Sequence, residues 1–182
     1  DRAGGRYYYK NYRMQYGFIE DGGKRYFMNA DGTLYKKGWL GDSLNMMYMD
    51  TKDGHMLTDL VEIGGKKYYF DSNGLMQRGM IPLNGKIYLF GADGAMQYGW
   101  YTDASGMRYF QTNGAMAVNT TLAVGGVTYV FDANGLATAV PVINPATWVT
   151  DPATGVTIDT ATGAVVPAET VAAAAAAAIA QK

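Results

Sequence analysis

The sequence contains no cysteine, so it has neither disulfide bonds nor thiolate metal sites. Its 15 Lys and Arg residues nearly balance its 16 Asp and Glu residues, and the formal net charge is -1 at pH 7. A nucleic-acid or anionic-membrane partner requires a basic face or stripe, which this balance does not favour. No run reaches the roughly 18–20 apolar residues of a membrane-spanning helix. We therefore expect no nucleic-acid partner and no membrane span.

Residues suited to catalysis are also scarce. The only histidine, His55, directly follows a turn glycine, and the serines lie in turns or connectors without a recognisable base. The carboxylates are spread along the chain and do not form the pair that glycoside hydrolysis needs. The Asp-Gly and Asn-Gly turns lack the further oxygen ligands of an EF-hand calcium loop. We expect a protein that is not an enzyme, with no catalytic residue, cofactor or metal ion.

Glycine and aromatic residues, in contrast, are abundant and regularly placed. The segment KKYYFDSNGLMQRG (residues 66–79) returns as GKIYLFGADGAMQYG, GMRYFQTNGAMAVN and GGVTYVFDANGLAT. The turn glycines of six copies, which are 22, 20, 20, 20 and 21 residues apart, are Gly32, Gly54, Gly74, Gly94, Gly114 and Gly135. With a degenerate earlier copy there are about seven repeats between Gly5 and Val140, and such a period is typical of repeat architectures.

Each repeat predicts a β-hairpin. In residues 66–79, KKYYF is the first expected strand, DSNG is the turn and LMQRG is the second strand. Asp71 can accept a hydrogen bond from the backbone two residues on, and Gly74 can adopt a positive φ without a Cβ clash. The segments MIPLNG and WYTDASG are interpreted as connectors, where Pro82 is tolerated.

These hairpins are expected to stack on one another. Alternation places Tyr68 and Phe70 on one face of a strand and Tyr69 on the other. An isolated two-stranded hairpin is marginal in water, so seven of them can share a core only through contact with their neighbours. The expected apolar seam combines the same-face aromatic residues with adaptable methionines, namely Met76, Met96 and Met116. The predicted fold class is all-β, a solenoid of stacked β-hairpins.

The composition changes to Thr, Ala, Val and Pro after Val140. Two D-x-A-T-G turns favour a linker or small hairpin over residues 141–167. Residues 168–182 predict a short Ala-rich helix, because alanine is the best helix former and Glu169 suits the first turn. The predicted domains are thus residues 1–140, 141–167 and 168–182. The helix has no strong amphipathic face, which makes the C-terminal tail a candidate for self-association.

The repeats GGKKYYFDSNGLMQRGM and GKIYLFGADGAMQYGW resemble the cell-wall-binding repeat superfamily. That group includes choline-binding repeats of surface proteins and lysins, glucan-binding repeats of glucosyltransferases, and repeats of large clostridial toxins. The resemblance implies a β-hairpin solenoid that is extracellular or on the surface of a Gram-positive-type bacterium. It also implies that ligands lie between consecutive hairpins.

Choline recognition requires an aromatic cage around the quaternary ammonium. Trp39 and Trp100 each follow a glycine, as in choline-binding repeats. The tryptophan that precedes the tyrosine pair in those repeats is replaced here by Arg25, Lys67, Ile87 and Arg108. Cations at this position would repel choline. The YYFD-x-NG pattern is nearer the glucan-binding and clostridial-toxin-type repeats, which favours a glucan-like ligand over choline.

Most aromatic residues of the repeats are expected to be core and strand-pairing residues. The outward rings and the two repeat tryptophans are better ligand candidates, because a flat apolar face with a polar tip suits a pyranose. The predicted inter-repeat ligand-binding residues are Trp39, Tyr48, Tyr69, Tyr88, Trp100, Tyr101, Tyr109 and Tyr129.

The leading hypothesis is a non-catalytic module that binds a cell-wall or extracellular polysaccharide and anchors or targets a larger surface protein. The sequence begins inside the repeat pattern, so we expect a longer protein. One alternative is a structural spacer or filament-forming surface subunit. Another is the targeting region of a wall hydrolase, glucosyltransferase or toxin.

Overall fold

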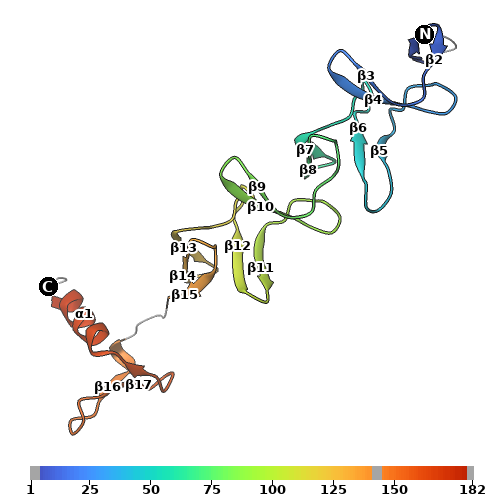
Figure 1. Ribbon diagram of the computed structural model, residues 1–182. Helices are drawn as coiled ribbons and strands as arrows, with labels where there is room; N and C mark the ends of the chain where they lie inside the picture. Colours follow the sequence, from blue (N-terminus) through green and yellow to red (C-terminus); the bar gives the residue numbers. More distant parts are fainter. Residues whose placement is uncertain (1–4, 141–144, 180–182) are drawn as a thin grey trace. The chain divides into compact units, whose positions relative to one another are not determined.

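The computed structural model describes residues 5–140 and 145–179 (Figure 1). The first residues of the predicted linker and the last residues of the predicted helix lie outside this range. Contacts divide the chain into two compact units. The first comprises the described residues up to Leu122 together with Val130–Thr138, and the second comprises Ala123–Tyr129 together with the described residues from Ala139 onward.

Repeated antiparallel hairpins make up most of the chain, which confirms the predicted β class and its hairpin repeat. Six two-stranded sheets occur among the described residues: β1 (Tyr9–Lys10) with β2 (Arg13–Met14), β3 (Gly17–Asp21) with β4 (Lys24–Met28), β5 (Gly38–Leu40) with β6 (Met47–Met49), β7 (Asp59–Ile63) with β8 (Lys66–Phe70), β9 (Gly79–Leu83) with β10 (Lys86–Phe90), and β11 (Gly99–Asp103) with β12 (Gly106–Phe110). The next sheet has three strands in the order β13 (Thr120–Val124), β14 (Val127–Phe131) and β15 (Ala137–Ala139).

The predicted position of the hairpin within each repeat was wrong. The segment MIPL, interpreted as part of a connector, belongs to β9, and Asn84-Gly85 forms the loop to β10. Both loop residues have positive φ, 50° and 73°, which is the two-residue turn that matches the twist of antiparallel strands. The expected second strand, LMQRG, instead makes a single bridge from Met76 to Phe70. Pro82 is accommodated inside β9 because each strand of a two-stranded sheet has a free edge.

The turn that ends at the repeat glycine connects one repeat to the repeat before it. The residue two positions after the turn glycine donates its backbone N–H to a carbonyl oxygen of the preceding hairpin, at 2.7–2.8 Å. The donor and acceptor pairs are Met56 to Arg25, Met76 to Met46, Met96 to Lys67, and Met116 to Ile87. Consecutive repeats of the first unit are therefore hydrogen-bonded through their backbones.

The core follows the same period. Phe70, Phe90, Phe110, Phe131 and Met49 are the largest fully buried side chains. Tyr68 and Phe70 are buried while Tyr69 is half-buried, as the predicted alternation requires, and the three methionines of the expected seam are also buried.

Most turn glycines also leave space for the methionine of the preceding repeat; Gly54 instead lies against Leu34 and Lys36. A Cβ atom at Gly94, where φ is +78°, would lie 2.2 Å from Sδ of Met76. The same close approach joins Gly74 to Met56, Gly114 to Met96 and Gly135 to Met116. Glycine is required at these positions for its left-handed backbone and for its missing side chain.

The second unit contains a small sheet and a helix. After a 3₁₀ turn, η1 (Pro145–Thr147), strands β16 (Trp148–Thr150), β17 (Thr157–Asp159) and β18 (Val165–Val166) pair in that order. Thr157 is buried, and its hydroxyl lies 2.8 Å from the hydroxyl of Thr150. Helix α1 (Ala168–Ile179) follows. None of the helices described here has the length and apolar character needed to cross a membrane.

Candidate functional site

A cavity of about 710 Å³ lies against the hairpins β9–β10 and β11–β12. Aromatic rings contribute much of its lining, from Tyr98, Trp100, Tyr101 and Phe110. Tyr98 is 49% exposed and Trp100 is 38% exposed, so both rings are accessible from solvent. The cavity therefore presents flat apolar surfaces that the core of the first unit does not cover.

The turn that begins at Gly91 explains why the larger cavity has space. In the preceding repeat, Asp71 fills the first turn position, and its Oδ2 accepts a hydrogen bond from Nε2 of Gln77 at 3.1 Å. The corresponding residue here is Gly91, which lines the cavity and has no side chain to fill it. Its backbone does not need glycine, because its φ is not in the left-handed region. A Cβ atom at Gly91 would meet only the flexible amide end of Gln97 and a carboxylate oxygen of Asp93 at close range.

Polar groups line the cavity beside the rings. The guanidinium of Arg78 donates to the carbonyl oxygen of Ala92 from Nε at 2.9 Å and to that of Ser43 from Nη2 at 2.8 Å. These two bonds hold Arg78 across three repeats. The side chains of Asp93 and Gln97 add further groups that can bond to hydroxyls.

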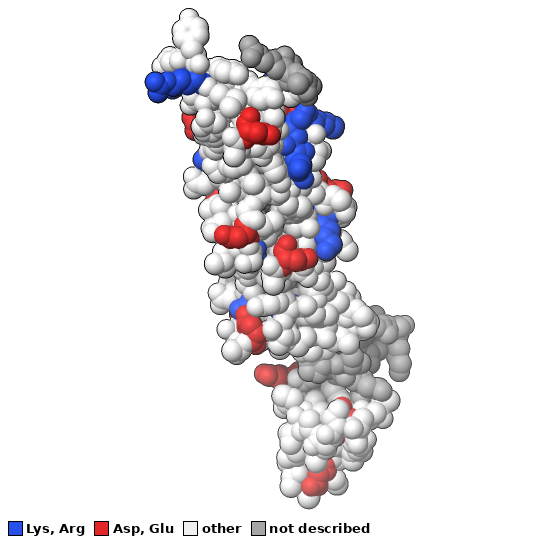
Figure 2. Space-filling model, turned by 90° about the vertical axis from the view of Figure 1, so that its right-hand side faces the viewer, with Lys and Arg blue, Asp and Glu red and all other residues white. Residues whose placement is uncertain are grey.

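Asp93 is ionised and partly neutralised. The backbone N–H of Ala95 and the ammonium of Lys66, 3.0 and 3.3 Å away, hold the pKa of Asp93 below its usual range. Such pairs recur on the repeat region, where Figure 2 shows acidic side chains among basic ones. The cavity therefore carries both signs of charge, with Arg78 and Asp93 in its lining.

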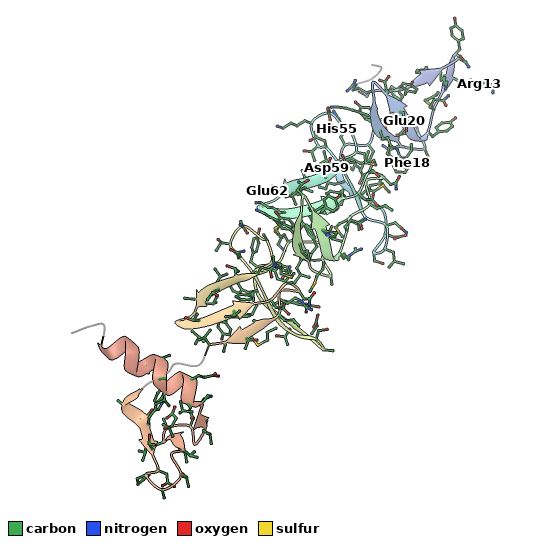
Figure 3. All side chains as sticks on the ribbon, turned by 60° about the vertical axis from the view of Figure 1, so that its left-hand side comes forward. Arg13, Phe18, Glu20, His55, Asp59 and Glu62 are labelled. Carbon is green, nitrogen blue, oxygen red and sulfur yellow. The ribbon has the colours of Figure 1, made fainter. Side chains whose placement is uncertain are left out.

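A smaller cavity of about 370 Å³ lies between the hairpins β7–β8 and β9–β10. The rings of Tyr69 and Tyr88 line it, together with Asp59 and Asn84. Asp59, which is labelled in Figure 3, begins β7 with a φ of 67°. It occupies the place that glycine has before Trp39 and Trp100.

The structure divides the predicted ligand-binding residues among different environments. Trp100 and Tyr101 line the larger cavity, and Tyr69 and Tyr88 line the smaller one. Tyr109 makes an edge contact with Trp100, with ring centroids 5.0 Å apart. The assignment of these five residues to a ligand remains a prediction.

The other three predicted residues lie elsewhere. Trp39 and Tyr48 contact each other edge-to-face at 5.0 Å, and Trp39 lies 5.1 Å from the buried Tyr68. Both pack against the core cluster around Phe70. Tyr129 is half-buried and belongs to the second unit.

Sequence reasoning did not identify Arg78, Asp93, Gln97 or Tyr98 as residues of a site. One signal was present: Gly91 replaces the aspartate that begins the neighbouring turn at Asp71. The missing side chain at this turn position, where other repeats have Asn29, Asp71 or Gln111, marks the repeat in which the cavity forms.

The cations at the predicted choline-cage positions are partly engaged in other contacts. Arg108 donates to Oδ2 of Asp103 at 2.7 Å, and this bond lowers the pKa of Asp103. Arg25 lies over the ring of Phe18, 5.1 Å from its centroid, and Figure 3 labels Phe18 on β3.

One cluster away from these two cavities contains residues that metals favour, namely Asp50, Asp53 and His55. Its oxygen atoms already serve the turn, since Oδ1 of Asp50 accepts the backbone N–H groups of Lys52 and Asp53. Asp53 also contacts the His55 ring and accepts from the ammonium of Lys24 at 3.1 Å. The His55 hydrogen bond holds the pKa of Asp53 well below its usual range.

The fold and the cavities define a protein of repeated β-hairpins with aromatic pockets beside its repeat junctions. Two family sequence models match parts of the repeat region. The choline-binding repeat matches residues 77–120, which include all of the larger cavity's lining, and the cell wall binding repeat matches residues 17–34 and 58–76. The repeats at residues 17–34, 58–76 and 77–120 are thus of the cell-wall-binding and choline-binding type.

Solved structures from Streptococcus pneumoniae are similar to the chain. CbpJ matches with a TM-score of 0.66 and 24% identity over 88% of this chain and 56% of its own. Choline binding protein F matches with a TM-score of 0.61 and 27% identity over 86% of this chain and 53% of its own, including a structure with a peptidoglycan analogue. The chain thus spans about half the length of these proteins. Curated protein sequences gave no match.

Proposed function

We propose that this chain is a non-catalytic module whose hairpins stack as a solenoid and bind a cell-wall or extracellular polysaccharide. The observation that carries the proposal is the cavity in which the rings of Tyr98, Trp100 and Tyr101 meet the polar side chains of Arg78 and Asp93. In this proposal the module anchors or targets a larger protein at the surface of a Gram-positive-type bacterium. The family of its repeats supports that setting.

The chemistry of the cavity suits a pyranose ring. The C–H face of the sugar stacks on a flat ring such as Trp100, and the hydroxyl groups bond to charged and amide side chains at the edge. Arg78 is held in place by two carbonyl oxygens, so little side-chain entropy is lost when it donates to a ligand. One such contact is weak, and binding at several repeats of one polymer raises the overall affinity.

Choline is the second candidate ligand, and the family match over the larger cavity favours it. A quaternary ammonium would lie against the faces of the rings of Trp100 and Tyr98. The guanidinium of Arg78 in the same lining opposes a cationic ligand. A glucan-like ligand is therefore proposed ahead of choline for this cavity.

Pull-down of the full chain with purified cell walls, insoluble glucan and choline resin tests the proposal. The expected result is retention on walls or glucan that weakens at least several-fold in Trp100→Ala. Gly91→Asp is a second variant. The new carboxylate can accept from Gln97 as Asp71 accepts from Gln77, and it enters the cavity without backbone strain. Leu44→Ala is the control, since Leu44 is 80% exposed and lines neither cavity.

Retention on choline resin but not on walls or glucan would identify choline, and not a polysaccharide, as the ligand. Absence of binding to every wall, glucan and choline matrix would refute the proposal. Equal binding by the Trp100→Ala and Leu44→Ala variants would show that the cavity is not the site.

A structural role is the alternative function, and the C-terminal helix favours it. Between Glu169 and Ile179, α1 has no charged side chain, although Ala172 and Ala173 are exposed. A helix without a polar face gains stability from packing on more than one side. Self-association through the tail is tested by sedimentation and electron microscopy of the full chain and of a chain ending at Val166. Ordered polymers formed only by the full chain would support the structural role.

A further inference from the structure

The chain contains the dipeptide Asn-Gly four times, at Asn73, Asn84, Asn113 and Asn134. An asparagine side chain that precedes glycine is open to attack by the next backbone nitrogen, because glycine has no Cβ atom to shield that nitrogen. The reaction requires a glycine N–H that solvent can deprotonate and a side-chain amide that can rotate toward it. The four sites differ in both respects.

Three of the four sites are protected. The N–H groups of the following glycines donate to backbone carbonyl oxygens at 2.8–3.0 Å; the pairs are Gly74 to Asp71, Gly114 to Gln111 and Gly135 to Asp132. All three glycines are buried under a methionine of the preceding repeat. The nitrogen at each site is therefore both hydrogen-bonded and shielded from solvent.

Asn84-Gly85 lacks this protection. Both residues are exposed in the two-residue loop between β9 and β10, and no atom lies within 4 Å of a Cβ placed on Gly85. Within the described part of the chain, the Gly85 N–H donates to no backbone carbonyl and the Asn84 side chain has no hydrogen-bond partner. Only the turn itself restrains the reacting atoms.

We propose that Asn84 is the site at which this protein deamidates spontaneously. The deprotonated backbone nitrogen of Gly85 attacks Cγ of Asn84, the new C–N bond closes a five-membered imide, and ammonia leaves. Water then adds to either imide carbonyl and opens the ring. The product is aspartate or β-linked isoaspartate at position 84, without any oxidation or reduction.

The consequence falls on the smaller cavity. Asn84 lines it with Asp59, Tyr69 and Tyr88, so either product adds a second carboxylate beside these rings. The isoaspartate product also lengthens the backbone inside a two-residue loop and disturbs the pairing of β9 with β10. If this cavity binds a ligand as in the proposed function, ageing shifts its preference toward cationic groups.

Peptide mapping by mass spectrometry tests the site. Trypsin isolates Asn84 in the peptide 79–86 and Asn73 in the peptide 68–78, so one digest compares two Asn-Gly sites. After incubation of the folded chain in mildly alkaline buffer, the deamidated fraction of 79–86 is expected to exceed that of 68–78 several-fold. In denaturant the two fractions should approach each other, because the fold no longer protects Asn73. Equal fractions in the folded chain, or more reaction at Asn73, would overturn the proposal.

The chain supplies a matched control. Asn84→Gly reproduces the Gly-Gly loop that β7 and β8 already use at Gly64-Gly65, so the hairpin should be retained. This variant should show no change in the mass of peptide 79–86 on ageing. Asn84→Asp measures the effect of the added charge on ligand retention. Retention unchanged in Asn84→Asp would refute the proposed effect on binding while leaving the site of deamidation and the wall-binding proposal intact.

Discussion

Substitution of a turn glycine tests how the repeats hold one another. In Gly94→Ala the new Cβ atom lies 2.2 Å from Sδ of Met76, so this buried methionine must move. Left-handed backbone costs a non-glycine residue roughly 1–2 kcal/mol, and overpacking a core costs about 1–3 kcal/mol more. The free energy of unfolding should therefore fall by about 2–5 kcal/mol, a large part of the 5–15 kcal/mol that is typical of a domain.

Gly79→Ala separates the two contributions. Gly79 has φ +83°, close to the +78° of Gly94, but no atom lies within 4 Å of its added Cβ. Urea unfolding followed by circular dichroism should show a loss of about 1–2 kcal/mol in this control. In the double variant Gly94→Ala with Met76→Ala, the steric term should disappear, and the two losses should not add. Equal losses in Gly94→Ala and Gly79→Ala would refute the role assigned to the methionine contact.

Three further outcomes are expected. Lys66→Ala removes the exposed ion pair with Asp93 and should lower the free energy of unfolding by less than about 1 kcal/mol, with a smaller effect at high salt in urea titrations. The lowered pKa of Asp103 contributes stability above its ordinary pKa of about 3.9, which is lost as the pH falls through the lowered value; Arg108→Gln should reduce this acid dependence in a pH series of thermal unfolding. Thr157→Val removes a buried hydroxyl–hydroxyl bond and should cost the second unit about 1 kcal/mol in thermal unfolding, whereas an unchanged midpoint would contradict the role of that bond.

The sequence predicted the repeat and the burial pattern because both depend on short-range chemistry. Strand alternation separates Tyr68 and Phe70 from Tyr69, and the structure has the same division. The position of the hairpin within the repeat was mispredicted because each repeat contains two turn signals. Asn84-Gly85 joins paired strands, whereas Asp71 begins a turn that leads the chain back to the preceding hairpin.

The sequence did not distinguish the environments of the two repeat tryptophans. Trp39 and Trp100 occupy the same place in their repeats, and both were predicted to bind ligand. Trp39 packs against Tyr68 and the core cluster, while Trp100 lines a cavity. Trp100 also contacts a buried ring, that of Phe131, with ring centroids 6.1 Å apart, yet it remains 38% exposed. The two sites therefore differ in how much of the tryptophan ring the surrounding side chains cover.

The sequence by itself determined the period, the aromatic and methionine core, and the superfamily to which the repeats belong, since these properties repeat every 20 residues or so along the chain. Only the tertiary structure decided which Asn-Gly dipeptide is exposed and where a cavity forms. Both depend on which backbone groups and side chains of neighbouring repeats come together in space. The missing side chain of Gly91 becomes a cavity because Arg78, Trp100 and the other lining groups surround that position.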